Sequence, residues 1–220
     1  MIEKIRVTLW DLLTFFLSGF FVSIIIIFHL IVLENDMCIS LIKLLKDIPT
    51  SYVLFTTLMS LTLTGMLIEP VANIVDKKII APVLSKLKLV RSRNIREKEE
   101  LKSTISKILK SEMDEEITNT YHFCKDYVEQ KQLTTNFMVF LARFGFYRNV
   151  SFLCFVTGIF SLFIYEEIIN SIIALFVWLI FTVIYKKRSE DFFSYQAPTL
   201  YRAFLADRYI TKQNNKINLQ

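Results

Sequence analysis

The amino-acid sequence predicts an all-α integral membrane protein, a four-helix bundle in the membrane with a cytoplasmic layer of amphipathic helices. Of its 220 residues, 53% are hydrophobic and 21% are charged, whereas soluble domains carry about 25% charged residues. The apolar residues gather in four long runs, and the basic residues gather in alternate polar segments between those runs. Glycine and proline occur only four times each, which excludes collagen-like and proline-rich disordered chains.

Four apolar runs predict membrane-spanning helices, because lipid offers no partner to a backbone amide outside a helix or a closed barrel. A helix of about 20 residues crosses a hydrocarbon core about 30 Å thick, and the first run has 22 residues without a formal charge. It is longer than the apolar core of a signal peptide, about 7–15 residues, so we expect it to be retained. Glu166 and Glu167 alone separate the last two runs, which predicts a helical hairpin. The runs are residues 12–33, 52–75, 150–165 and 168–185.

The distribution of basic residues predicts the orientation of the chain. Cytoplasmic segments of membrane proteins carry an excess of Lys and Arg. Of the 26 basic residues, 24 lie before the first run, between the second and third, or after the fourth. We therefore expect a multi-pass protein of a bacterial inner membrane with both termini in the cytoplasm. Its predicted parts are an N-terminal transmembrane pair with a periplasmic loop (1–75), a cytoplasmic helical segment (76–149), a C-terminal transmembrane hairpin (150–185) and a cytoplasmic tail (186–220).

Helical periodicity in the polar segments predicts amphipathic helices. Apolar residues recur every three to four positions from Leu101 to Val128, with no glycine or proline between them. This pattern predicts one long helix that starts near Asn94. A second amphipathic helix (137–144) is expected to run into the third apolar run, and another is expected after Pro198 in the tail. We expect these cytoplasmic helices to pack their apolar seams against one another.

Glu69 and Pro70, at the end of the second apolar run, are the first candidate site, and His29 in the first run is another. A carboxylate near hydrocarbon is costly and tends to be paired or to face water, and a proline disturbs the preceding helical turn. Together they can form a kinked gate or an ion-binding ring in an oligomer. Alternatively, His29 is an ordinary interfacial residue, and Glu69 pairs with a nearby cation, Lys77, Lys78 or Arg148.

Seven basic residues between positions 77 and 96, with no acidic residue among them, form a second candidate site. Juxtamembrane cations bind anionic lipid, each contributing about 1 kcal/mol. Alternatively, the stretch docks an anionic cytoplasmic ligand such as a nucleotide or an oligonucleotide, or an acidic partner protein. The residues are Lys77, Lys78, Lys86, Lys88, Arg91, Arg93 and Arg96.

The sequence contains no catalytic motif. It has no GxSxG, no HExxH and no glycine-rich phosphate loop, and two histidines are too few for a histidine-based acid/base pair. Cys38, Cys124 and Cys154 are expected in three different compartments, so neither a disulfide within the chain nor a metal cluster is expected. We therefore expect no enzyme activity, no metal and no cofactor.

Three stretches resemble small bacterial four-span membrane proteins found in phage-defence loci. They are the opening LWDLLTFFLSGF, the approach RFGFYRNVSF to the third apolar run and the ending YRAFLADRY. Within that group, the chain resembles both the membrane effector of Hailong-type defence and the membrane sensor of Kiwa-type defence. The resemblance implies a homo-oligomeric membrane protein that detects infection or damages the membrane.

These observations lead to a functional expectation. We expect a homo-oligomeric inner-membrane effector of anti-phage defence, a tetramer, that is a gated ion-conducting or membrane-depolarising protein. Its expected partners are membrane lipid and either a cytoplasmic nucleotide or oligonucleotide ligand or a soluble partner protein encoded nearby. The alternative is a non-conducting membrane sensor or scaffold that recruits a soluble defence effector. A lipid-handling enzyme or a transporter accessory is a third class.

Overall fold

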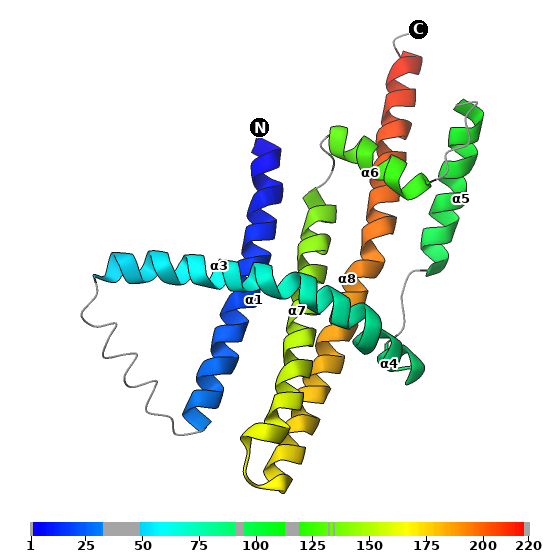
Figure 1. Cartoon of the computed structure of the whole chain (residues 1–220). Helices are drawn as coiled ribbons and strands as arrows, with labels where there is room; N and C mark the ends of the chain where they lie inside the picture. Colours follow the sequence, from blue (N-terminus) through cyan, green and yellow to red (C-terminus); the bar gives the residue numbers. More distant parts are fainter. Residues whose placement is uncertain are drawn as a thin grey trace. The chain divides into compact units, whose positions relative to one another are not determined.

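The computed structural model describes residues 2–32, 49–90, 95–112, 119–131, 133 and 135–217. Nearly all of these residues are helical and none of them forms a strand (Figure 1), so the all-α prediction is confirmed. The elements are α1 (Ile2–Val32), α3 (Thr50–Val75), the π-helical turn η1 (Asp76–Ile80), α4 (Ala81–Lys86), α5 (Ile95–Glu112), α6 (Thr120–Gln130), α7 (Thr135–Ile164) and α8 (Ile168–Ile217).

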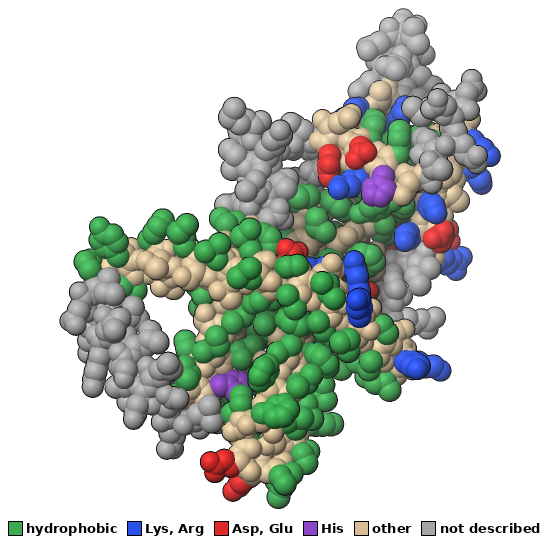
Figure 2. Space-filling view, viewed as in Figure 1, with side chains coloured by type: hydrophobic (Ala, Val, Ile, Leu, Met, Phe, Trp, Pro, Cys, Tyr) green, Lys and Arg blue, Asp and Glu red, His purple; other side chains and the backbone are tan. Residues whose placement is uncertain are grey.

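Four helical segments are long and apolar enough to cross a membrane. Many of their apolar side chains are exposed, Leu67 to 74% and Phe163 to 80%, as expected for helices surrounded by lipid. Hydrophobic side chains cover much of the visible face of α3 and of the α7–α8 hairpin (Figure 2). Each segment overlaps one predicted apolar run, and the last three extend beyond it: Leu12–Ile31, Thr50–Lys86, Phe137–Ile164 and Ile168–Thr211.

The chain divides into two compact units. The span unit comprises Ile2–Arg91 and Ala142–Ser189, and the amphipathic unit comprises Ser92–Leu141 and Glu190–Gln220. The span unit holds all of α1, α3, η1 and α4, whereas the amphipathic unit holds α5 and α6. Both α7 and α8 contribute residues to each unit, and each is an uninterrupted helix.

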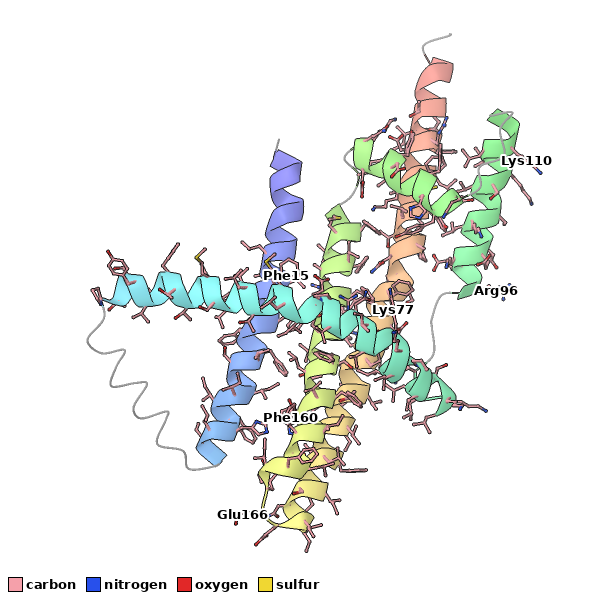
Figure 3. The ribbon with its side chains drawn as sticks, in the orientation of Figure 1. Phe15, Lys77, Arg96, Lys110, Phe160 and Glu166 are labelled. Atoms are coloured by element: carbon pink, nitrogen blue, oxygen red, sulfur yellow. The ribbon has the colours of Figure 1, made fainter. Side chains whose placement is uncertain are left out.

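Two glycines determine how α1 and α3 cross in the span unit (Figure 1). A Cβ added to Gly19 would lie 1.8 Å from the backbone oxygen of Leu61, and one added to Gly65 would lie 1.9 Å from the backbone oxygen of Phe15. Small residues allow this close approach of backbones, which stabilises helix association where lipid removes the hydrophobic driving force. Phe15 marks the α1 side of the crossing in Figure 3.

The third and fourth apolar runs lie in two consecutive helices, α7 and α8. A short turn around Glu166, labelled in Figure 3, connects them. At the turn, the hydroxyl of Ser171 donates to the backbone oxygen of Tyr165 at 3.1 Å. Deeper in the span unit, the hydroxyl of Ser151 on α7 donates to the backbone oxygen of Thr182 on α8 at 3.0 Å.

The amphipathic unit has its own hydrophobic core. Tyr201 and Phe204 of α8 are 1% and 0% exposed within it. At its edge the ammonium group of Lys131 lies 2.7 Å from a carboxylate oxygen of Asp207, and this hydrogen bond lowers the pKa of Asp207. The buried core residues are Ile105, Leu109, Cys124, Val128, Phe137, Ala197, Leu200, Tyr201 and Phe204.

The prediction of one long helix from residue 94 to residue 128 is wrong. The described part of α5 extends to Glu112, Asn119 has a non-helical backbone, and a separate helix, α6, begins at Thr120. Asn119 caps α6, because its side-chain oxygen accepts hydrogen bonds from the backbone amides of Tyr121 and His122. The apolar period continues across the break because both helices face the same core. Asn94 itself lies outside the described residues.

The prediction of a separate tail helix after Pro198 is also wrong, because α8 continues through Pro198. A proline inside a helix removes one backbone hydrogen bond and costs about 3 kcal/mol. Pro198 is fully buried here, and its neighbours Leu200 and Tyr201 belong to the core of the amphipathic unit. Burial of these side chains offsets the cost and keeps the helix continuous.

Replacing Gly65 with alanine is expected to lower the melting temperature of the detergent-solubilised protein, since overpacking costs about 1–3 kcal/mol. Gly145→Ala is the matched control, because its new Cβ would meet nothing closer than the Thr14 side chain at 3.6 Å. Circular dichroism during heating measures both variants. Equal melting temperatures would contradict the close crossing of α1 and α3.

Candidate functional site

A cluster of charged and polar side chains lies inside the span unit, among helices that are otherwise apolar. Four elements provide its ionisable and amide side chains, and α1 adds one hydroxyl. Ionisable residues among membrane-spanning helices are rare, and they usually pair with one another and serve a function. The members of this polar cluster are Ser18 (α1), Glu69 and Asn73 (α3), Asp76 (η1), Arg148 and Asn149 (α7) and Lys186 (α8).

The pair of Lys186 and Asp76 is the more buried of the two ion pairs in the polar cluster. The ammonium nitrogen lies 2.6 Å from a carboxylate oxygen, and the two side chains are only 2% and 7% exposed. Because removing either charge from water costs several kcal/mol, each group is stable there only beside the other. The pair connects η1 to α8 over 110 residues of sequence.

Arg148 connects α7 to α3. Its guanidinium lies 3.0 Å from a carboxylate oxygen of Glu69 and donates to the side-chain oxygen of Asn73 at 3.3 Å. Glu69, Asn73 and Asp76 are spaced by four and three residues and so follow one face of the helix. The structure thus pairs Glu69 with Arg148, one of the three partners expected from the sequence, and the side chain of Glu69 remains 38% exposed.

The polar cluster keeps unused hydrogen-bonding capacity. The side-chain amide of Asn149 donates to the hydroxyl of Ser18 at 3.2 Å, but its oxygen has no partner among the described residues. The same holds for one carboxylate oxygen of Asp76 and for the Nε of Arg148. Each buried unpaired atom costs about 1–3 kcal/mol, so an arrangement that supplies partners to these atoms would compete with the present one.

The backbone changes its winding at the polar cluster. Pro70 follows Glu69 inside α3, where it has no amide to donate to the preceding turn. Asp76 then begins the five-residue π-helical turn η1, which joins α3 to α4. π-Helical turns occur mainly as single turns inside α-helices, and frequently at functional sites. The buried Asp76 therefore lies at the position where this helix departs from regular α-helical geometry.

His29 does not join the polar cluster. Its Nδ1 lies 2.8 Å from the backbone oxygen of Ile25, and its ring stacks on Trp178 of α8 at a centroid distance of 6.4 Å. These contacts favour the interpretation of His29 as an ordinary packed residue of α1. The structure therefore brings together Glu69 and Pro70, but not the third residue of the gating prediction.

The seven basic residues of the second candidate site do not form one described patch. Arg91 and Arg93 lie outside the described residues, and Arg96 belongs to the amphipathic unit, where it pairs with Glu100 at 2.9 Å (Figure 3). The other four belong to the span unit and are exposed: Lys77, Lys78, Lys86 and Lys88. Exposed apolar side chains alternate with them along the chain: Ile79, Val83, Leu87 and Leu89.

The thiols and the metal-ligating side chains add no further site. Cys124 and Cys154 are buried free thiols, and burial raises the pKa of Cys124 to about 12. Cys38 lies outside the described residues. Within the described part of the chain, no three histidine, cysteine or acidic side chains are grouped as metal ligands would be.

Comparison of the chain with protein-family models, with curated proteins and with solved structures finds no match. Asp76, Asn149 and Lys186 are members of the polar cluster that the sequence did not single out. They border apolar runs and look like ordinary juxtamembrane residues. Only the opposite charges of Asp76 and Lys186, each directly after an apolar run, hinted at a pair.

Replacing Asp76 with asparagine is expected to destabilise the protein by about 3–5 kcal/mol, because it removes the carboxylate that neutralises the buried ammonium group of Lys186. Adding Lys186→Met should recover most of this loss, since it removes the buried positive charge that the asparagine no longer neutralises. Unfolding in mixed micelles, followed by circular dichroism, measures both variants. Glu69→Gln is the control and should cost less, because Glu69 is far more exposed than Asp76.

If the double variant is no more stable than Asp76→Asn alone, Lys186 and Asp76 are not energetically coupled. That result would remove the pair from the description of the polar cluster.

Proposed function

We propose that this chain is a multi-pass protein of a bacterial inner membrane, a four-helix bundle with cytoplasmic termini and a cytoplasmic layer of amphipathic helices. Four segments of sufficient length and hydropathy support the crossings. The orientation is supported by the 24 of 26 basic residues in the predicted cytoplasmic segments. The hairpin tip, with Glu166 and Glu167 and no basic residue, then lies on the periplasmic side.

A reporter fusion tests this topology. Alkaline phosphatase fused after Gln220 is expected to be inactive, and the same enzyme inserted after Glu166 is expected to be active, because it folds only in the periplasm. Measuring both activities at equal expression decides the orientation. The reverse pattern would contradict cytoplasmic termini.

The function that the polar cluster supports best is that of a gated ion-conducting or membrane-depolarising protein. The single observation that carries this proposal is the buried pair of Lys186 and Asp76. Two opposite charges held together give a neutral, closed arrangement. Their separation would place both charges, along with Arg148 and Glu69, where water and ions can reach them, which links conduction to helix movement.

The conducting form is a homo-oligomer in this proposal, with a tetramer as the expected assembly. Most side chains of the polar cluster are buried between the helices of one chain, so a hydrated path is better formed between copies. The exposed apolar faces of α1 and α3 provide surface for contact with other copies or with lipid. A closed point group is the usual form of such assemblies.

For the basic stretch, the exposed alternation of lysines with apolar side chains in η1 and α4 favours lipid as the partner. A segment with apolar and cationic side chains lies well at a membrane surface, where anionic headgroups meet the lysines. The controlling cytoplasmic ligand or partner protein would then bind elsewhere, in the amphipathic unit. The role in anti-phage defence rests on the resemblance of the three stretches described above.

Breaking the buried pair is expected to open the protein. In vesicles of purified protein, Lys186→Met should increase ion flux about tenfold over wild type, which corresponds to about 1.4 kcal/mol of altered gating equilibrium. A fluorescent potential-sensitive dye measures the flux. Lys187→Met is the matched control, because the neighbouring lysine is exposed and should leave the flux unchanged.

The double variant Asp76→Asn/Lys186→Met covers the case in which Lys186→Met does not fold, and it should also conduct. Folded protein that conducts in no variant would contradict the gated conductor. It would favour the alternative, a non-conducting sensor or scaffold that recruits a soluble defence effector through its amphipathic unit.

A further inference from the structure

The amphipathic unit contains a cavity that neither the sequence motifs nor the polar cluster accounts for. Its volume is about 370 Å³, within the range of about 300–1,000 Å³ typical of small-molecule sites. Three elements of one unit line it, so it needs no contribution from the span unit. The lining residues that matter here are Lys98, Glu99 and Lys102 on α5, Tyr121 on α6, and Gln196 and Tyr201 on α8.

Gln196 is the first sign that the cavity serves a ligand. Its side chain lines the cavity and is only 5% exposed. Its amide nitrogen has no hydrogen-bond partner among the described residues. A buried donor left unpaired costs about 1–3 kcal/mol, and an apolar residue of similar shape would avoid this cost. A ligand that accepts a hydrogen bond from Gln196 would explain why the cavity wall contains a buried amide at this position.

Aromatic side chains form part of the same wall. Tyr121 is half-buried and Tyr201 is buried, and Phe193 adds a third ring to the lining. Burial raises the pKa of Tyr121, and it raises that of Tyr201 to about 12, so both phenols stay neutral near pH 7. Planar rings beside an amide suit a flat heteroaromatic group, which can stack on a ring while the amide binds its edge.

Two exposed lysines stand at the α5 side of the cavity. Lys98 and Lys102 are four residues apart and so share one face of α5. Neither has a hydrogen-bond or ion-pair partner among the described residues. Glu99 also lines the cavity, and a carboxylate is the usual acceptor for the hydroxyls of a ribose. The cavity thus combines cations for a phosphate, a carboxylate for a sugar and an amide with aromatic rings for a base.

We propose that this cavity is a nucleotide site that takes one nucleotide, with the base against Gln196 and Tyr121 and the phosphate at Lys98 and Lys102. The small volume suits a single nucleotide, either free or at the end of an oligonucleotide. The inference deepens the proposed function and in that sense rests on it, because it names the controlling ligand and where it binds. Binding to the purified chain can nevertheless be measured whether or not the protein conducts ions.

Calorimetric titration of the full chain in lipid nanodiscs tests the site with four probes: AMP, adenosine, inorganic phosphate and a four-nucleotide adenine RNA. AMP is expected to bind in the micromolar range, and adenosine at least about tenfold more weakly, since it lacks the charge that the lysines bind. Phosphate alone should not bind measurably. Tighter binding of the RNA than of AMP would identify an oligonucleotide end as the source of the nucleotide.

Two variants separate the parts of the site. Gln196→Leu should weaken the binding of AMP and the binding of adenosine by the same factor, about tenfold, because it removes a contact to the base. The double variant Lys98→Ala/Lys102→Ala should weaken the binding of AMP about tenfold and leave the affinity for adenosine unchanged. Lys107→Ala/Lys110→Ala is the matched control, because these two lysines of α5 do not line the cavity, and it should bind AMP as wild type does.

Circular dichroism shows that each variant is folded, and Gln196→Glu, which replaces the amide donor with an acceptor, substitutes for Gln196→Leu if that variant does not fold. Two results would contradict the nucleotide site. One is that neither AMP nor the RNA binds at about 1 mM. The other is that the lining and the control lysine variants lose the same amount of AMP affinity. If binding is found in a protein that never conducts, the nucleotide site stands and only the conducting function fails.

Discussion

The buried ion pair of Lys186 and Asp76 is the constraint on which the span unit depends. A lone charge buried between apolar helices is unstable. The pair of Lys186 and Asp76 therefore fixes the position of α8 relative to η1. Arg148 and Glu69 add a second, more exposed bridge from α7 to α3. Charge neutrality inside the helices is thus achieved by pairs between elements distant in sequence, and any large movement of α8 against η1 must first separate the pair.

Two kinds of contact hold the span unit together, and they differ in how they respond to movement. The crossing of α1 and α3 at Gly19 and Gly65 is a close backbone contact that tolerates no added atoms, so it behaves as a rigid point. The polar cluster, by contrast, holds buried atoms without a hydrogen-bond partner among the described residues, and an arrangement that paired them would gain free energy. A gate at the polar cluster, with a fixed crossing elsewhere, is consistent with these properties.

The helix α8 connects the two proposed activities. It carries Lys186 of the polar cluster and, ten residues later, Gln196 of the cavity, with no interruption between them. Energetic coupling between distant sites is commonly transmitted by rigid secondary-structure elements. A nucleotide can control the gate only through different affinities for the closed and open states, and α8 is the helix that contains both residues.

The amino-acid sequence by itself determined the helical class, the four apolar segments and the α7–α8 hairpin, because these follow from local hydropathy and from a two-residue acidic turn. It did not determine where helices end inside polar segments. Asn119 begins a new helix and Pro198 fails to end one, since a cap and a shared core decide both outcomes. Only the tertiary structure determined the polar cluster and the cavity, because each is made of residues from segments distant in sequence. Asp76 pairs with Lys186, and Lys98 and Gln196 line the same cavity.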